Sequence, residues 1–533
     1  MASVSKFSRL LNTLLRVARA LVLPHRASRE EQDFAAENAR HWRGQTASKD
    51  TGGAILVETA LSSPASLLEK FLIAKTIEQK TDAQVVAILN ALYVQASSAH
   101  LVAQSFGVSR FVCWWRGYLH PLRVGQALAQ TLSLILLKRS GRALLDLQID
   151  GIHIGDLVYD TLIRYRPNCY TVGMLSLRSH FRLIFRALFN FHSSQALFCR
   201  FKVRAIVTSH NVYAEFGILC RIAHRHGAVI FLKDMDVFRV YDAQSNVYEH
   251  FLRIAPEERR AGMADPDLIA KAEDYFNRRL NGAIDQVDLN NAYGNKQTYG
   301  KAELLAMFGA DPRKKTVFVL AHAFSDAPHV GGKLAFDDYY DWLRQTLGRL
   351  SANKDVNVFV KPHPSSYMWG EKGAVEVLLN ELGVTNIYIT PSDFNTLSIK
   401  SIADYVVTAR GTAGLEYSGL GIPAVTCGEG YYSGFGIALE HIDREAYFTS
   451  LDSIATLQPL PAKVSQCARV LLYLTFTKLA RSTLAPARHM YPGDDDAVLT
   501  PQHYAEISAN LRQKGLAQDA FLTQVERAVG RAF

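Results

Sequence analysis

Short apolar runs alternate with longer segments of helical periodicity through the first half of the chain. Between these runs, apolar residues recur at helical spacing over Ser66–Gln79, Val124–Leu137 and Phe181–Phe198. The alternation predicts a parallel sheet with helices on both of its faces. The apolar runs that predict its strands are Ala54–Val57, Val85–Leu89, Phe111–Trp114, Ala205–Thr208 and Val229–Leu232.

A second series of the same kind follows a more polar stretch. Residues 240–312 have a helical pattern and are expected to connect two domains. The chain then closes with helices, including Val464–Leu479. The predicted fold class is therefore α/β, with two Rossmann-like domains that face each other across a cleft. The strands predicted for the second domain are Val317–Ala321, Val356–Val360, Ile387–Ile389, Tyr405–Thr408 and Ala424–Thr426.

These patterns divide the chain into five segments. A basic amphipathic helix is expected over residues 1–29, and an N-terminal Rossmann-like domain over residues 50–239. The helical connection covers residues 240–312, a C-terminal Rossmann-like domain residues 313–450, and the C-terminal helices residues 451–533. Two domains are also what 533 residues lead one to expect, because single hydrophobic cores rarely grow to this size.

Composition excludes several classes of protein. With 48% hydrophobic and 20% charged residues, the chain as a whole is neither disordered, collagen-like nor a coiled coil. The net charge of +9, from 59 Lys and Arg against 50 Asp and Glu, is too diffuse to indicate a nucleic-acid partner. The six cysteines are far apart and form no CxxC pair, which predicts buried thiols in a reducing compartment.

The first 29 residues indicate a membrane surface. Apolar residues recur there at helical spacing, and Pro24 ends the segment. The segment carries no acidic residue, and Arg16 and Arg19 interrupt the apolar stretch that a signal peptide needs. The pattern favours a basic helix on an anionic membrane, although a helix packed on the protein's own surface gives the same pattern. The expected location is cytoplasmic, peripherally associated with the inner face of the cell membrane, and no transmembrane helix is predicted.

Three unusual segments follow strands of the second domain, where open parallel sheets bind ligands. The first runs from His322 to His329, and the second, Lys361-Pro362-His363-Pro364, follows the next strand. The third, Arg410-Gly411-Thr412-Ala413-Gly414-Leu415-Glu416, lies where a strand turns into a helix. Each segment alone is typical of an ordinary loop. Their succession at consecutive strand ends predicts a site for a nucleotide phosphate.

The residue types explain how such a site would work. Prolines stiffen the turn around His363, whose imidazole can donate a hydrogen bond or a proton to a phosphate. Gly411 and Gly414 let backbone amides approach the phosphate at a helix N-terminus. Glu416, one turn into that helix, can accept hydrogen bonds from ribose hydroxyls. Asp326, in the loop after the first strand of this domain, is a nucleophile candidate, with a turn-capping carboxylate as the alternative.

These motifs resemble the nucleotide half of the GT-B glycosyltransferases, in particular bacterial capsule and lipopolysaccharide enzymes that use CMP-activated sugars. The His-Pro motif is followed about fifty residues later by the Arg410–Glu416 segment and by Gly421-Ile422-Pro423-Ala424-Val425. The stretch from His322 to His329 and the run from Gly421 to Gly436 are most similar to the retaining β-Kdo transferases. Two segments of the first domain also resemble capsule proteins, and these are Ile154–Asp160 and Ser209–Tyr213.

The resemblance implies roles for individual residues. Asp326 would form a covalent sugar–aspartate intermediate as CMP leaves, and His363 would stabilise or protonate the departing phosphate. No cofactor is expected, since the CMP-sugar is the donor substrate, and no metal is expected either. Asp234-Met235-Asp236 resembles the metal-binding string of other sugar transferases but lies away from this site. The residues expected to bind the donor are Lys361, Arg410, Gly411, Thr412, Ala413 and Glu416.

The acceptor side has several candidates for a general base. Glu215 is preferred over His210, although both lie just beyond the strand Ala205–Thr208. Asp156 and Asp160 form another pair, on one face of a predicted helix. Trp114 and Trp115 are candidates to line an acceptor groove, with packing in the core as the alternative.

The expected function is transfer of an acidic sugar, with Kdo as first choice, from a CMP donor to a surface glycan or glycolipid with retention of configuration. A transferase that uses a UDP-sugar or CDP-glycerol is a rival, because a His-Pro motif and a ribose glutamate suit those donors too. A third hypothesis is a non-catalytic scaffold for capsule assembly. The expected partners are therefore a nucleotide-sugar donor, a glycan or glycolipid acceptor and an anionic membrane surface.

Overall fold

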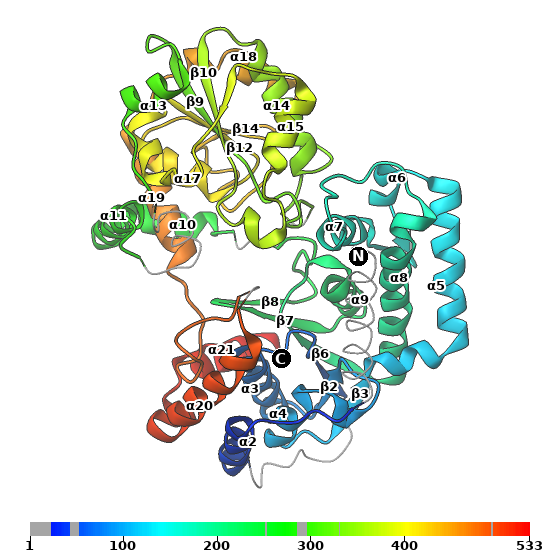
Figure 1. Cartoon of the computed structure of the whole chain (residues 1–533). Helices are drawn as coiled ribbons and strands as arrows, with labels where there is room; N and C mark the ends of the chain where they lie inside the picture. Colours follow the sequence, from blue (N-terminus) through cyan, green and yellow to red (C-terminus); the bar gives the residue numbers. More distant parts are fainter. Residues whose placement is uncertain (1–22, 43–52, 251–252, 285–295, 330, 492–493) are drawn as a thin grey trace, which may run out of the picture.

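The computed structural model describes residues 23–42, 53–250, 253–284, 296–329, 331–491 and 494–533. Its first domain is built on a sheet with the strand order β3-β2-β1-β6-β7-β8 (Figure 1). Neighbouring strands are parallel except β7 and β8, which are antiparallel. The strands are β1 (Ala54–Glu58), β2 (Gln84–Leu89), β3 (Arg110–Cys113), β6 (Val203–Thr208), β7 (Val229–Asp234) and β8 (Val237–Tyr241).

The apolar residues of these strands are buried under helices on both faces of the sheet. α3 (Pro64–Lys80) and α4 (Ala99–Ser105) pack against β1 and β2, and α9 (Ile218–Arg225) packs against β6 and β7. Two long helices, α5 (Pro121–Ser133) and α8 (Leu177–Arg200), pack against each other at one side of this domain (Figure 1). α5 continues as one π-helical turn, Leu134–Lys138. The short elements between them are α6 (Gly141–Leu145), the hairpin β4 (Gln148–Ile149) and β5 (Ile152–His153), and α7 (Gly155–Tyr165).

The second domain contains a fully parallel sheet with the order β11-β10-β9-β12-β13-β14. Its buried core includes Trp342 of α14 (Tyr339–Ala352), which packs with residues of α15 (Ala374–Leu382) and α18 (Arg444–Asp452). The short helices α16 (Ile399–Ile402) and α17 (Thr412–Gly419) lie before and after β12. The strands are β9 (Lys315–Leu320), β10 (Val356–Lys361), β11 (Ile387–Ile389), β12 (Tyr405–Thr408), β13 (Ala424–Thr426) and β14 (Leu439–Glu440).

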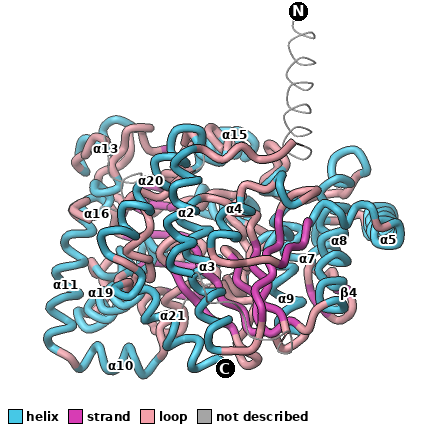
Figure 2. Tube along the Cα trace, turned by 90° about the horizontal axis from the view of Figure 1, so that it is seen from below, coloured by secondary structure: helices cyan, strands magenta, loops and turns pink. Residues whose placement is uncertain are grey.

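The remaining helices either connect the two domains or pack on the first one. In the connecting segment, α10 (Pro256–Ala264) and α11 (Pro266–Leu280) pack against α19 (Ala462–Phe476), and α13 (Lys301–Phe308) leads into β9. The chain then returns to the first domain, where α20 (Asp496–Lys514) packs on α2 (Arg29–Trp42) and α21 (Ala520–Ala532) packs on α3. Figure 2 shows α2, α3, α20 and α21 gathered on one side of the molecule. The last helices are thus part of the N-terminal domain in space.

The predicted fold class is confirmed: the chain is α/β with two Rossmann-like domains in a GT-B-like arrangement. All ten predicted strands are present, with ends within two residues of those predicted. The edge strands β8 and β14 were not predicted, because β8 spans the predicted boundary between the first domain and the connection, and β14 has only two residues. Five cysteines are buried as expected, whereas Cys199 is exposed on α8.

The sequence makes two predictions about membranes, one about a basic N-terminal helix and one about transmembrane helices. The basic segment over residues 1–29 lies largely outside the described residues, and its described part, from Leu23 to Ser28, precedes α2 without being helical. Among the described helices, none combines the length and the apolar character that a membrane crossing requires.

Candidate functional site

Lys361 and His363 lie at the carboxyl end of β10, as the sequence predicts. The Lys361 ammonium is buried and has no hydrogen bond or ion pair with any described residue. Burial and the neighbouring Lys296 lower the pKa of Lys361 to about 7. Burial, Lys361 and Lys296 lower the pKa of His363 to about 4. Cationic groups that repel one another in a buried place form a site that an anion would stabilise.

The hydrogen bonds around His363 define which of its nitrogens can serve a ligand. Its Nδ1 accepts the backbone N–H of Ser365 at 3.2 Å, so in the neutral ring Nε2 carries the proton. A neutral His363 is therefore a hydrogen-bond donor through Nε2. With a pKa of about 4, it is a poor source of a full proton near neutral pH until an anion binds.

His322 extends this group to the end of the adjacent strand, β9. It is stacked on Tyr339 with ring centroids 4.2 Å apart, and its Nε2 accepts the backbone N–H of Arg410 at 3.3 Å. Burial, His363 and Arg410 hold the pKa of His322 well below its usual range. The ends of β10, β9 and β12 thus bring together two imidazoles, an ammonium and a guanidinium, which is the electrostatic environment of an anion site.

The Arg410 side chain serves mainly to hold neighbouring loops. Its guanidinium donates to the carbonyl oxygens of Gly332 at 3.5 Å and Lys333 at 3.3 Å, and only 1% of the residue is exposed. Its buried Nε has no hydrogen-bond partner among the described residues and faces Gly428, where a Cβ atom would lie 2.9 Å away. The predicted contact of Arg410 with a phosphate stays a prediction.

Gly411 is the N-cap of α17, and Thr412 and Ala413 form its first turn. The backbone N–H groups of a first turn have no partner within the helix and favour an anion. Gly414 must be glycine because Tyr432 lies against it, and a Cβ atom would be 2.1 Å from the Tyr432 hydroxyl. That hydroxyl donates to the Gly411 carbonyl at 2.8 Å, which fixes the turn where the predicted phosphate site begins.

Glu416 has a partner that the sequence did not indicate. Its Oε1 accepts from Arg279 Nε at 2.8 Å, and both side chains are buried. Arg279 belongs to α11 and stacks over the Phe476 ring at 4.6 Å. Oε1 of Glu416 is thus engaged in joining α11 to α17, and its role toward a ribose stays a prediction.

Asp326 lies in an exposed bend of the loop that follows β9. The loop is held firmly from the side of its own domain, because the Glu371 carboxylate accepts the backbone N–H groups of Phe324 and Ser325, both at 2.9 Å. Ala327, next to Asp326, adopts a left-handed φ of 43°, which is unfavourable for a residue with a Cβ atom. The backbone on both sides of Asp326 is therefore constrained, by Glu371 before it and by the strained Ala327 after it.

The N-terminal domain holds the same loop from the other side. The Tyr213 hydroxyl donates to the Ser325 carbonyl at 3.1 Å, and Tyr213, which also has a positive φ of 55°, packs against Ala327. Asp160 of α7 contacts His329, and Tyr159 donates to Asp338 at 2.7 Å. The segments after β6 and β9 therefore meet at the junction of the two domains, and Asp326 lies between Ser325 and Ala327, the two residues of its loop that Tyr213 contacts.

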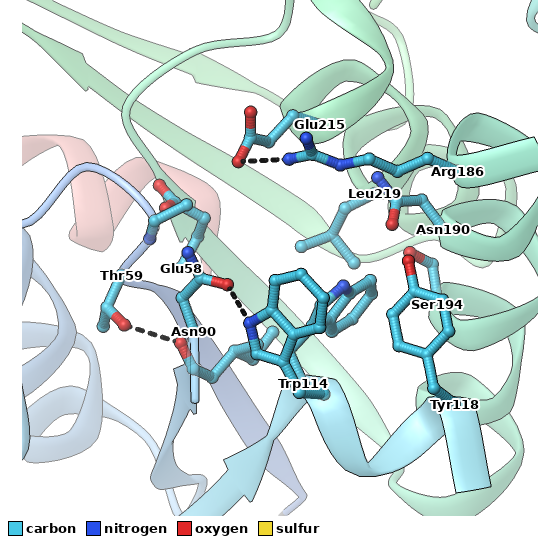
Figure 3. Close-up of a pocket in the computed structure, with 13 residues that line it drawn as sticks. Glu58, Thr59, Asn90, Trp114, Tyr118, Arg186, Asn190, Ser194, Glu215 and Leu219 are labelled. Carbon is cyan, nitrogen blue, oxygen red and sulfur yellow. Dashed lines mark hydrogen bonds and ion pairs between the residues drawn. The ribbon is translucent and has the colours of Figure 1, made fainter. Parts of the chain in front are cut away.

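The N-terminal domain contains a pocket at the carboxyl ends of β1, β2 and β3 (Figure 3). Trp114 and Trp115 line it, which favours the groove interpretation of this pair over simple packing. Trp115 Nε1 donates to Asn90 Oδ1 at 2.8 Å, and its ring stacks on Tyr118. The other lining residues are mostly polar: Glu58, Thr59, Ala60, Ile88, Arg186, Asn190, Ser194, Glu215 and Leu219.

Glu215 is the lining carboxylate that faces Arg186, with Oε1 3.4 Å from Nη2 (Figure 3). Burial raises the pKa of Glu215, against the opposing effect of Arg186, and the nearby Glu58 raises it further. A carboxyl group with a raised pKa is suited to accept a proton near neutral pH. Tyr165 links this pocket to Asp326, because its hydroxyl contacts Glu215 Oε2 at 3.5 Å and its ring lies edge-on to Tyr213.

The other candidates for the base have partners of their own. Asp156 forms a buried, two-pronged ion pair with Arg221, and His210 pairs with Asp234 at 3.2 Å. Asp160 is bound to His329. Glu215, by contrast, lines the pocket at the ends of β1, β2 and β3.

The two carboxylates of Asp234-Met235-Asp236 face different imidazoles. Asp234 pairs with His210, and Asp236 pairs with His489 at 3.2 Å. Within the described ranges, no cluster of His, Cys, Asp and Glu is arranged to hold a metal ion.

Sequence reasoning missed several residues that the fold brings to the site. His322 was considered only as part of a motif, although its position directly after β9 matches that of His363 after β10. Lys296 and Arg164 come from segments with no distinctive pattern, and Tyr213 was noted only as the end of the Ser209–Tyr213 resemblance. Only the fold brings them to the domain junction or, for Lys296, beside Lys361.

No protein-family model matches the chain, and no curated protein matches it. Solved structures that are similar to it include the β-Kdo 2,4 transferase KpsC of Thermosulfurimonas dismutans. That similarity has 15% identity and a TM-score of 0.32, and it covers 50% of this chain and 79% of that one. An O-GlcNAc transferase of Thermobaculum terrenum has 12% identity and a TM-score of 0.26, with 97% of this chain and 77% of that one covered. The UDP-GlcNAc 2-epimerase of Neisseria meningitidis has 10% identity and a TM-score of 0.21, with coverage of 80% and 99%. At this distance, these similarities bear on neither substrate nor mechanism.

Proposed function

We propose that this protein is a glycosyltransferase that takes its sugar from a nucleotide donor. The observation that carries the proposal is Lys361, a buried ammonium without an ion-pair partner among the described residues. It lies beside His363 at the end of β10, and His322, at the end of the adjacent β9, lies next to Gly411 at the start of α17. Burying an unpaired charge is costly, and a phosphate at this place would offset that cost.

The donor proposed is a CMP-activated acidic sugar, with Kdo as first choice, on the strength of the motif resemblance. An Asp326 carboxylate oxygen attacks the anomeric carbon, while the bond from that carbon to the phosphate oxygen breaks and its electron pair leaves with CMP. Lys361 and the Nε2–H of His363 stabilise the charge that develops on the phosphate. The result is a sugar–aspartate ester and free CMP.

The acceptor is proposed to be a glycan or glycolipid whose terminal sugar enters the pocket of the N-terminal domain. Indole rings such as those of Trp114 and Trp115 cover the apolar faces of a sugar, while Asn190 and Ser194 offer hydrogen bonds. The acceptor hydroxyl oxygen attacks the anomeric carbon as its proton passes to Glu215, and the Asp326 carboxylate leaves. Two displacements at one carbon retain the configuration.

A donor screen tests this function. The protein is incubated with CMP-Kdo, UDP-sugars or CDP-glycerol, each with and without a crude glycolipid extract, and release of the nucleotide is measured. Acceptor-dependent release of CMP from CMP-Kdo is expected. Release from a UDP-sugar or CDP-glycerol would mean that the protein is a transferase with a different donor. Nucleotide binding without any turnover would favour the non-catalytic scaffold.

A further inference from the structure

Arg164 belongs to α7, a helix on the side of the N-terminal domain that faces the C-terminal domain (Figure 1). Its guanidinium is 3.4 Å from the centre of the Trp369 ring, which belongs to the loop after β10, and 5.5 Å from the centre of the Tyr213 ring. Two aromatic rings, one from each domain, therefore fix the plane and position of this cation.

The Arg164 guanidinium has no hydrogen bond or ion pair with any residue in the described part of the chain. Its Nη1 atom is buried and lacks an acceptor. Guanidinium groups at buried places are almost always satisfied by carboxylates, phosphates or carbonyl oxygens, because an unmet charged donor is costly. An arginine fixed by stacking but left without an acceptor is thus arranged to bind an anion from outside the chain.

The position of Arg164 relative to Asp326 indicates which anion this is. Tyr213 contacts both segments: its hydroxyl donates to the carbonyl of Ser325, the residue before Asp326, at 3.1 Å, and its ring centre lies 5.5 Å from the Arg164 guanidinium. Lys361 and His363, the groups proposed for the donor phosphate, follow β10, whereas Arg164 comes from the opposite domain. An anion at Arg164 would therefore lie beside the carbon that Asp326 attacks.

We propose that Arg164 binds the carboxylate of the transferred sugar and thereby selects an acidic sugar over a neutral one. The inference rests on the proposed function, since it takes the donor sugar to lie against Asp326. A carboxylate suits the two parallel N–H groups of a guanidinium. It also needs a cation here, because it would otherwise lie next to the carboxylate of Asp326 and be repelled.

The test compares two substitutions. Arg164→Met keeps much of the packing volume and removes the charge, whereas Arg164→Lys keeps the charge and loses the two parallel N–H donors of the guanidinium. Arg142→Met, at an exposed arginine of α6 near α7, serves as the matched control. Three quantities are measured for each protein: the affinity for CMP by calorimetry, the KM and kcat for CMP release from CMP-Kdo, and the midpoint of denaturant unfolding.

In Arg164→Met, we expect the affinity for CMP to stay within about twofold of the wild-type value, while kcat/KM for CMP-Kdo falls by about tenfold or more. Arg164→Lys should recover part of the loss, and Arg142→Met should behave as the wild type. An equal loss of CMP affinity would instead assign Arg164 to the donor phosphate and overturn the proposal. An unchanged kcat/KM in a folded Arg164→Met would leave it a packing residue.

Failure of this inference is distinguishable from failure of the proposed function. If the wild type releases no nucleotide from any donor, the transferase itself is wrong. If the wild type turns over neutral UDP-sugars better than CMP-Kdo, the transferase stands and the selection by Arg164 is wrong.

Discussion

Asp160 Oδ1 lies 2.5 Å from His329 Nδ1, across the junction of the two domains. The other imidazole nitrogen, Nε2, lies 2.7 Å from the Asp337 carbonyl, which can only accept, so Nε2 carries a proton. The Asp160 carboxylate raises the pKa of His329 against the opposing effect of burial. Because His329 lies three residues after Asp326 in the segment that follows β9, this pair connects α7 to the segment of the proposed nucleophile.

Asp160→Asn should therefore lower turnover without weakening nucleotide binding. We expect at least a tenfold fall in kcat, unchanged CMP affinity and a loss of about 3 kcal/mol in the free energy of unfolding, as for other broken buried pairs. Denaturant titrations and CMP-release kinetics measure these quantities, with Asp82→Asn, at an exposed position, as the control.

The same pair makes this loss of stability dependent on pH. Since the folded-state pKa of His329 is raised above 6.5, the stabilisation is complete below that pH and is lost as the pH rises through the folded-state value. The difference in unfolding free energy between wild type and Asp160→Asn should therefore shrink as the pH rises through the folded-state pKa of His329. A difference that grows with pH would contradict the charged pair.

The pKa of Lys361 predicts how nucleotide binding depends on pH. With a value of about 7, the free protein carries the charged ammonium below that pH and loses it above. The dissociation constant for CMP should consequently rise through the range above pH 7, by up to about tenfold per pH unit. Calorimetry between pH 7 and 9 measures this, and Lys361→Met should bind more weakly and show no such slope. The same slope in Lys361→Met would mean that another group titrates.

Much of this site was predictable because its residues adjoin regular strands. Lys361, His363 and Gly411 directly follow apolar runs, and the carboxyl ends of parallel strands meet at one edge of the sheet. Contacts between distant segments have no local signal. Arg279 meets Glu416 from 137 positions away, and Arg164 meets Trp369 across the domain junction. The packing of α20 and α21 on the first domain likewise depends on apolar faces that come together only in the folded chain.

Two substitutions can separate a ligand-binding role of Glu416 from a structural one. Glu416→Ala should weaken CMP binding by about 1.5–3 kcal/mol, the range for losing a charged hydrogen-bonding partner. Arg279→Met removes the partner of Glu416 while leaving the carboxylate in place. If the carboxylate binds the ribose, only Glu416→Ala loses CMP affinity in calorimetry. If both variants lose stability and both keep their affinity, Glu416 only joins α17 to α11.

The N-terminal sequence predicts binding to anionic membranes through charge and apolar area together. Removing residues 1–24 should lower partitioning onto vesicles that contain anionic lipid, and added salt should lower the partitioning of the intact protein. Co-sedimentation measures both effects, with vesicles of neutral lipid as the control. Binding that neither change affects would indicate a helix packed on the protein itself.

Asp326 provides the test that separates mechanism from fold. Its loop is held by Glu371 on one side and by Tyr213 on the other, and neither contact uses the Asp326 carboxylate. Asp326→Ala should consequently leave folding and CMP affinity nearly intact, while transfer falls by several powers of ten, as expected for a lost nucleophile. Intact enzyme given donor without acceptor should gain the mass of one sugar, and peptide mapping should place it on the segment around Asp326. Substantial transfer by a folded Asp326→Ala would instead leave Asp326 as a carboxylate that caps the turn before Pro328. Residual transfer is the stronger test of the nucleophile assignment, because water can hydrolyse the ester before an adduct is detected.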